Sequence, residues 1–176
     1  MRSVVVYESM FGNTHAVAEA IATGLRRTGE VLIVPVEQAT HDVLVGADLL
    51  VVGGPTHAHG MSSSQSRKGA PDYVAKSDGD LTLEPGWDGL GLRDWFKELP
   101  DAPCAGAAFD TRVDVAALLS GRASKGIADR LRKHGCRLVA DPESFLVSKE
   151  THLLPHELDR AAEWGATLAA SLVPHA

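Results

Sequence analysis

Short β-type runs alternate with longer helical stretches along this chain of 176 residues. The short runs have the length and the apolar content of strands, and the stretches between them carry apolar residues at helical spacing. This alternation constrains the fold most, because strands joined through helices pair in parallel, with helices on both faces of the sheet. The expected strands are residues 3–7, 31–36, 47–54, 104–110 and 136–147, the last interrupted at Asp141 and Pro142. The sequence therefore predicts an α/β fold with a doubly wound, five-stranded parallel sheet.

Two of these runs also indicate their place in the sheet. Pro35 has no backbone N–H to donate to a ladder, so we expect the second strand at an edge. The third run, ADLLVVGG, is continuously apolar, which is typical of a strand covered on both faces. The expected helices are residues 15–29, 92–99, 123–135 and 154–173, and residues 41–46 are expected to form a short helical turn at most.

Length and composition are those of one globular domain spanning residues 1–176. Apolar residues make up 44% of the chain and charged residues 23%, which is the balance of a soluble protein. No apolar run approaches the roughly 20 residues that a membrane span needs. The first residues also lack a secretory hydrophobic segment, so we expect a cytoplasmic protein without a membrane span.

Charge and cysteine content narrow the classes of partner and site. The formal net charge of −6 argues against nucleic acid as a partner, because neutralising phosphates requires clustered Lys and Arg. Cys104 and Cys136 lie outside any CxxC pattern, which indicates neither a zinc site nor a disulfide framework. We expect two ordinary thiols that are buried or half-buried.

The periodic pattern breaks down after the third strand. Residues 55–89 are rich in Gly, Ser, Pro and Asp and contain few apolar anchors. A loop of this length inside a compact domain is usually a functional lid or a disordered segment. We therefore expect residues 61–89 to form a lid or a flexible insertion, with Trp87 and Trp95 anchoring it and the following helix to the core.

The first strand runs directly into SMFGNT, residues 9–14, before the first helix. In a doubly wound sheet ligands bind at the carboxyl ends of the strands. A helix N-terminus there holds a phosphate through free N–H groups and the helix dipole, without a lysine. Gly12 allows close approach, and Ser9, Asn13 and Thr14 add hydrogen-bonding groups. Neither GxxxxGK[ST] nor GxGxxG is present. The alternative is a plain strand-to-helix turn with a capping residue.

SMFGNT resembles the phosphate loop of the flavodoxins, whose pattern is hydroxyl, x, hydroxyl, Gly, x, hydroxyl. Ser9, Gly12 and Thr14 match this pattern, and Asn13 is a common occupant of its position. Phe11 departs from it where a hydroxyl residue is frequent, which removes one phosphate contact. The resemblance extends over nearly the whole chain and implies the strand order 2-1-3-4-5, with FMN as the cofactor.

Two further segments, GGPTHAHG and FDTR, fall where this family places its two flavin-contacting loops. The resemblance implies that Gly60 lies near flavin N5, where a peptide can reorient on reduction, and that Arg112 can stabilise a reduced, anionic ring. The cofactor-binding residues expected on this basis are Ser9, Met10, Phe11, Gly12, Asn13, Thr14, Pro55, Thr56, His57, Ala58, His59, Gly60, Asp110, Thr111 and Arg112.

Other interpretations of these segments remain open. His57 and His59 are spaced to share a metal ion, although no Cys or carboxylate nearby in the sequence completes a ligand shell. The same segment can be a merely solvated loop, and Arg112 an exposed arginine paired with Asp110 or Asp114. Flavodoxins usually sandwich the flavin ring between Trp and Tyr, whereas these loops offer two histidines and Phe109.

The leading functional hypothesis is a flavodoxin-type electron carrier that binds FMN and serves a redox partner protein. The second is an FMN-dependent oxidoreductase that acts on a quinone-like or porphyrinogen-type substrate beneath residues 61–89, because oxidase-like relatives carry an inserted loop. The third is a binding module without flavin. A receiver domain, which shares the strand order, needs acids at two strand ends, but this chain has only Glu8 at the first and Gly53 and Gly54 at the second.

Overall fold

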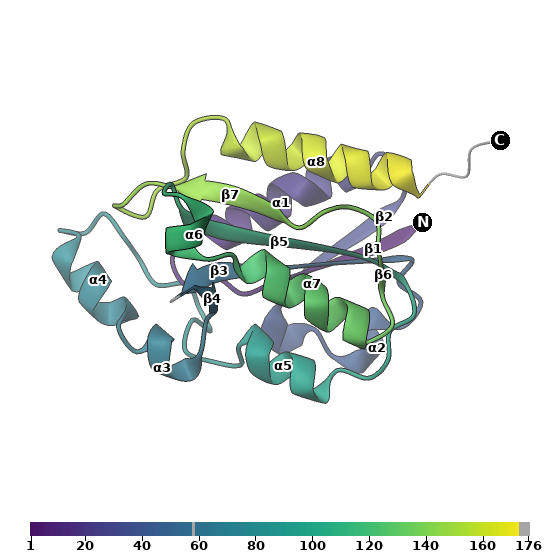
Figure 1. The fold of residues 1–176 in the computed structure, drawn as a ribbon, viewed down its shortest axis with the longest axis horizontal. Coiled ribbons are helices and arrows are strands. Elements are labelled where there is room, and N and C mark those ends of the chain that lie inside the picture. The colour runs from purple at the N-terminus through teal and green to yellow at the C-terminus, as the bar shows by residue number, and fades with distance from the viewer. Residues whose placement is uncertain (58, 173–176) are drawn as a thin grey trace.

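The computed structural model describes residues 1–57 and 59–172, which form one twisted sheet between two layers of helices (Figure 1). The sheet runs in the order β2-β1-β3-β5, and β6 and β7 both pair with β5 as two pieces of the fifth position. All pairings along this path are parallel. The predicted order 2-1-3-4-5 is therefore confirmed. The strands of the sheet are β1 (Arg2–Tyr7), β2 (Glu30–Pro35), β3 (Leu49–His57), β5 (Ala105–Val113), β6 (Arg137–Leu138) and β7 (Glu143–Val147).

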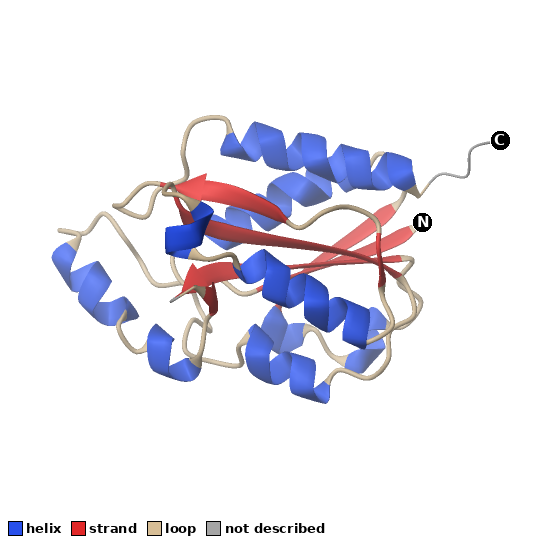
Figure 2. Cartoon of the chain, in the orientation of Figure 1, coloured by secondary structure: helices blue, strands red, loops and turns tan. Residues whose placement is uncertain are grey.

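The helices divide between the two faces of the sheet (Figure 2). On one face, α1 (Asn13–Leu25) and α8 (Glu157–Ser171) pack with β-strand residues in one apolar cluster. On the other, α2 (His41–Leu44), α5 (Leu92–Glu98) and α7 (Ala123–Lys133) pack in a second cluster. The short elements η1 (Val36–Gln38) and α6 (Ala117–Ser120) complete the connections. Each expected helix is present, and residues 41–44 form the expected short turn.

Strand β3 shows why its sequence lacks a polar face. Leu50 and Val52 point into the cluster beneath α5 and α7, while Leu49 and Val51 point into the cluster beneath α1 and α8. Since successive side chains of a strand lie on opposite faces, a central strand needs apolar residues at every position. β2 lies at the edge and ends at Pro35, as the sequence predicts.

The expected ends of two strands were wrong. β3 continues to His57 and β5 continues to Val113, so much of the two loops expected after them is strand. Gly53 lies inside β3 and pairs with Phe109 of β5. A Cβ on Gly53 would lie 2.1 Å from the ring of Phe109 on the neighbouring strand, so the absent side chain makes room for that ring. The polar residues near these strand ends are held by sheet pairing rather than by loop conformation.

The insertion is folded against the sheet and contains three short elements: β4 (Gly60–Met61), α3 (Ser64–Arg67) and α4 (Ala70–Lys76). β4 pairs with the end of β3 as an antiparallel hairpin. Figure 1 shows α3 and α4 beyond the carboxyl ends of the strands. Trp95 anchors α5, the helix that follows the insertion. Its ring is buried, and its Nε1–H donates to the carbonyl of Ala39 over 2.8 Å. Trp87 is half-buried.

A buried ion pair fastens the insertion to the end of β1. Glu8 and Arg67 are 5% and 3% exposed, and Nη1 of Arg67 lies 3.6 Å from Oε1 of Glu8. Ser62 donates its hydroxyl to Oε1, and the N–H of Leu92 donates to Oε2 over 2.8 Å. Arg67 also donates to the Ser62 hydroxyl and to the carbonyl of Gly89, each over 2.9 Å. One carboxylate thereby holds both ends of the insertion.

None of the helices that the structure describes combines the length and apolar character that spanning a bilayer requires.

Replacing Arg67 by Met is expected to lower the free energy of unfolding by about 3–5 kcal/mol, because it leaves the Glu8 carboxylate buried without its cation. The double variant Glu8→Gln/Arg67→Met removes both charges and is expected to recover a large part of this loss. Urea unfolding followed by circular dichroism measures both values. A double variant that is as unstable as the sum of its two single variants would contradict a direct interaction between the pair.

Candidate functional site

A cavity of about 340 Å³ opens at the carboxyl ends of β1, β3 and β5, the edge where a doubly wound sheet binds ligands. Its size is within the usual range of small-molecule sites. It is surrounded by the loop between β1 and α1, the ends of β3, β5 and β7, the insertion, and the segment after β7. The lining comprises Ser9, Met10, Phe11, Asn13, Thr14, Pro55, Thr56, His57, Ser66, Ala70, Tyr73, Thr111, Val113, Val147, Lys149 and Thr151.

The loop of residues 9–14 presents backbone N–H groups at the start of α1. The Ser9 hydroxyl accepts only one of them, from Gly12 over 3.1 Å. Within residues 1–57 and 59–172, the N–H groups of Phe11, Asn13 and Thr14 have no acceptor. The first turn contains no acidic residue, so no side chain competes for the positive end of the helix dipole. This arrangement suits an anion.

Gly12 is the residue before α1 and has a φ of 90°. A left-handed backbone of this kind is costly for most residues but not for glycine. A Cβ at this position would lie 3.7 Å from Oε1 of Glu84, which belongs to the insertion. Gly12 was predicted to allow close approach to a ligand, and its positive φ is a second, conformational reason for glycine at this position.

Two hydrogen bonds join the loop of residues 9–14 and the first turn of α1 to neighbouring segments. The hydroxyls of Thr14 and Thr111 are 2.8 Å apart, which joins the first turn of α1 to β5. The Asn13 amide donates to the carbonyl of Thr151 over 2.6 Å, which joins it to the segment after β7. Both contacts lie on the cavity wall, so they position three separate segments around one space.

The end of β3 brings Pro55, Thr56 and His57 to the cavity. The Thr56 hydroxyl accepts the N–H of Ala123 over 2.9 Å and so caps the start of α7. Burial lowers the pKa of His57, and the nearby Arg67 adds to this lowering, which favours the neutral imidazole.

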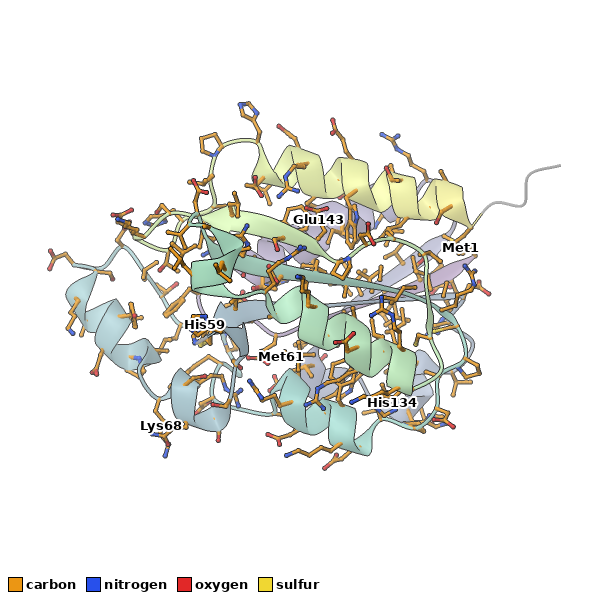
Figure 3. The ribbon with its side chains drawn as sticks, in the orientation of Figure 1. Met1, His59, Met61, Lys68, His134 and Glu143 are labelled. Atoms are coloured by element: carbon orange, nitrogen blue, oxygen red, sulfur yellow. The ribbon has the colours of Figure 1, made fainter. Side chains whose placement is uncertain are left out.

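The predicted residues His59 and Gly60, which follow His57, lie in and beside the β3–β4 hairpin rather than in the cavity lining. His59 is exposed, with a φ of 73°, and Figure 3 shows it beside the β3–β4 hairpin. Gly60 forms the hairpin pair with His57. Neither residue is among those that line the described cavity. Ala58, also predicted to bind the cofactor, lies outside the described residues.

Asp110 and Arg112 lie on β5 next to Thr111, yet neither is among the described residues that line the cavity. Asp110 is fully buried and its Oδ2 accepts the N–H of Ser124 over 2.7 Å, so it caps α7 as Thr56 does. Arg112 donates through Nη1 to the carbonyl of Val115 over 2.7 Å. Thr111 alone of the three faces the cavity, because successive residues of a strand alternate between faces.

Several of the residues that line the cavity were not predicted from the sequence. Ser66, Ala70 and Tyr73 come from α3 and α4, and Lys149 and Thr151 come from the segment after β7. Tyr73 lies 6.3 Å from Phe11 between ring centroids, with the rings tilted by 57°. An aromatic residue in an otherwise polar insertion was the available signal for Tyr73. Nothing local in the sequence marks Lys149, because only the pairing of β7 with β5 brings it to the site.

An acidic and a basic side chain, Glu84 and His15, lie together beside the loop of residues 9–14. The Glu84 carboxylate lies 2.8 Å from Nδ1 of His15, and the N–H of Glu84 donates to the carbonyl of Met10 over 2.8 Å. The ring of His15 stacks on Tyr7, with centroids 4.4 Å apart. Burial, followed by the charge of Glu84, raises the pKa of Tyr7 to about 12, so its hydroxyl stays protonated. The insertion is therefore attached to the loop from this side as well.

The metal hypothesis for His57 and His59 finds no support in the described part of the chain. Among those residues, no group of three or more His, Cys, Asp or Glu side chains is placed to hold a metal ion.

The buried carboxyl group of Asp110 is expected to make the stability of the fold depend on pH. Burial raises its pKa, so between the pKa of the unfolded chain, about 3.9, and the higher folded value the native state binds more protons. This contribution to stability is present below the unfolded pKa and is lost as pH rises through the folded pKa. We expect Asp110→Asn to remove that loss, so that at pH 7 its free energy of unfolding and its urea midpoint are higher than those of the wild type.

Urea titrations at several pH values measure this effect. Asp114→Asn, at an exposed position, is the control and is expected to follow the wild type. An Asp110→Asn variant that loses stability at pH 7 would show that the carboxylate is ionised and needed there.

The comparisons with known proteins agree with this geometry. A family model described as Flavodoxin matches residues 5–96, which include the loop before α1 and the end of β3. No curated protein matches the sequence.

Among solved structures, the chain is similar to a flavodoxin from the domain Archaea, with 22% identity, coverage of 97% of each chain and a TM-score of 0.64. It is also similar to flavodoxin 1 of Bacillus cereus, with 18% identity, coverage of 98% of this chain and 100% of the other, and a TM-score of 0.66. Flavodoxin 2 of the same organism gives 18% identity, the same coverage and a TM-score of 0.68. The structural similarity extends over the whole fold, and the family match covers more than half of the sequence: this chain belongs to the flavodoxin family.

Proposed function

We propose that this protein binds FMN in the cavity at the carboxyl ends of β1, β3 and β5 and serves as an electron carrier. The observation that carries the proposal is the set of backbone N–H groups of Phe11, Asn13 and Thr14, which have no acceptor within the described residues and border the cavity. Free N–H groups at a helix N-terminus bind phosphate. FMN ends in a single phosphate, which suits one such loop better than the pyrophosphate of FAD.

The residues around the cavity fit this cofactor. The loop before α1 supplies Ser9, Gly12, Asn13 and Thr14 for the phosphate. Lys149 lines the same cavity and adds a positive charge that does not depend on the loop. The wall formed by Pro55 and His57 offers flat, largely neutral surface for the heterocycle, since burial favours the neutral imidazole. The site thus combines an anion-binding end with an uncharged wall.

Phe11 and Tyr73 supply the aromatic surface that the sequence analysis did not find on the expected loops. Both line the cavity, and Tyr73 is 62% exposed on α4. Residues 61–89 act as a lid in this proposal, because Ser66, Ala70 and Tyr73 bound the cavity from that side. The buried Glu8–Arg67 pair keeps the base of the lid in place.

The bound flavin would supply the redox chemistry, accepting and releasing one or two electrons. The chain would bind the phosphate, orient the ring and limit access of water. Arg112 is held by the carbonyl of Val115 and the hydroxyl of Ser120 and so contributes charge from behind β5 rather than by contact. A redox partner protein would dock at the end of the sheet where the cavity opens.

Gly12→Asp is expected to weaken FMN binding at least about 100-fold, or about 2.7 kcal/mol. The new carboxylate would repel the phosphate and the nearby Glu84, and would occupy the close-approach position. Calorimetric titration of the protein with FMN, together with visible absorbance, measures the effect. Gly12→Asn is the matched control, because Asn has the same size, carries no charge and tolerates a positive φ. Wild-type protein that does not bind FMN would refute the proposal, and Gly12→Asp protein that binds normally would refute the assigned loop.

Tyr73→Ala is expected to lower FMN affinity by about 5- to 30-fold, since loss of a stacking aromatic costs about 1–2 kcal/mol. Emission of the bound flavin should also rise, because an adjacent tyrosine quenches flavin fluorescence. Tyr73→Phe keeps the ring and is expected to retain most of the affinity. Equal affinities for the Ala and Phe variants would place Tyr73 outside the binding site.

The lining residues from the insertion favour a second candidate, an FMN-dependent oxidoreductase with a quinone-like or porphyrinogen-type substrate under the lid. Steady-state turnover of a quinone with NAD(P)H separates the two candidates. A carrier shows none unless a separate reductase is added, whereas an enzyme turns over alone.

A further inference from the structure

Two thiols lie side by side at the end of the sheet opposite the cavity. The sulfur atoms of Cys104 and Cys136 are 3.7 Å apart, and both cysteines are free. Cys136 is 4% exposed, and Cys104 is half-buried. The proposed flavin function uses neither residue.

Strand pairing places these two residues next to each other. Cys104 and Cys136 immediately precede Ala105 and Arg137, which are partners in the parallel pairing of β5 with β6. The N–H of Arg137 donates to the carbonyl of Cys104 over 3.0 Å, so pairing extends to the cysteines themselves. Neighbouring strands lie about 4.8 Å apart, which is within the Cα separations of about 4.4–6.8 Å that disulfides span. Both side chains belong to the same apolar cluster, so they lie on the same face of the sheet.

Cys104 can be reached from outside, whereas Cys136 lies behind it. A second cavity of about 320 Å³ is lined by Cys104 together with residues from α2 and from the segment before β5. Cys136 does not line it, and its S–H donates to the carbonyl of Ala102 over 3.1 Å. A small reagent therefore meets the Cys104 sulfur first.

The two sulfur atoms are within hydrogen-bond contact of each other. Their mutual hydrogen bond lowers the pKa of Cys136 and raises the pKa of Cys104, because once one sulfur ionises the other retains its proton and donates it. The Cys136 thiolate can take the proton of Cys104 as the accessible Cys104 sulfur attacks, so Cys104 reacts as the thiolate, which is the reactive form.

We propose that Cys104 and Cys136 form a reversible dithiol–disulfide switch that reacts with low-molecular-weight disulfides entering the second cavity. The Cys104 thiolate attacks one sulfur of the reagent, forms a mixed disulfide and releases one thiol. The Cys136 thiolate then attacks Cys104, which releases the second thiol. In sum, two protein thiols and one small disulfide become one protein disulfide and two small thiols, with two electrons transferred to the reagent.

This switch is separate from the flavin site. β5 runs from Ala105 to Val113, so the thiols lie roughly 20–25 Å from the cavity at its other end. Oxidation would tie the start of β5 to the start of β6 and would close a loop that contains α6 and α7. The expected effect is a higher midpoint temperature of unfolding for the oxidised protein, because the cross-link restricts the unfolded chain.

The test treats the reduced wild-type protein, under native conditions, with an excess of glutathione disulfide. We expect the count of titratable thiols to fall from two to zero and the mass to fall by two hydrogen atoms. Non-reducing peptide mapping should recover a Cys104–Cys136 cross-link, and dithiothreitol should reverse it. Two thiols that remain titratable, a lasting glutathione adduct on the wild type, or disulfide-linked dimers would each overturn the proposal.

Two variants assign the roles of the thiols. Cys136→Ser is expected to stop at a stable glutathione adduct on Cys104, since no second thiol is present to displace it. Cys104→Ser is expected to remain unmodified, because Cys136 is shielded. The reverse pattern would overturn the order of attack. Circular dichroism verifies that each variant is folded, and the wild-type mapping decides the proposal if either is not.

Discussion

Burial of both faces of a parallel sheet is the constraint on which the rest of this structure depends. A central strand such as β3 carries apolar side chains toward α1 and α8 on one face and toward α5 and α7 on the other. The strands must then run in one direction, since each returns through a helix. All carboxyl ends consequently meet at one edge, where backbone N–H groups and polar residues are free of the core. The candidate site is a consequence of that geometry, and its chemistry comes from the loops.

Glu8 is the residue through which the insertion is attached to the sheet. It is the first residue after β1, where the chain leaves the sheet, and its buried carboxylate is satisfied entirely by the insertion and by the start of α5. A charge in such a position is tolerated only with a cation and hydrogen-bond donors around it. The insertion is therefore held to the residue that follows β1, and this attachment places Tyr73 at the cavity. Glu84 adds a second attachment, beside His15.

The strands, the helices and the loop at residues 9–14 could be predicted from the sequence, because each depends on local periodicity or on a short motif, and the strand order followed from the resemblance to the flavodoxins. The ends of β3 and β5 could not be, since residues 55–57 and 111–113 look like loop until their pairing with neighbouring strands is known. Thr56 and Asp110 were predicted as ligand contacts for their polarity, yet both cap α7. Tyr73 and Lys149 were missed because only long-range packing brings them to the cavity. Some polar residues near a site thus face the ligand, whereas others stabilise the surrounding fold. The sequence alone does not show which residue does which.

The break in the fifth position of the sheet has a consequence for self-association. An open sheet exposes unpaired backbone groups along both outer strands, and long, flat outer strands recruit other chains into aggregates. Here one outer position is divided into β6 and β7 around Asp141 and Pro142, and β2 on the other side ends in a proline. Neither border presents a long, regular row of donors and acceptors. The sheet that supports the site is thereby a poor template for amyloid-like growth.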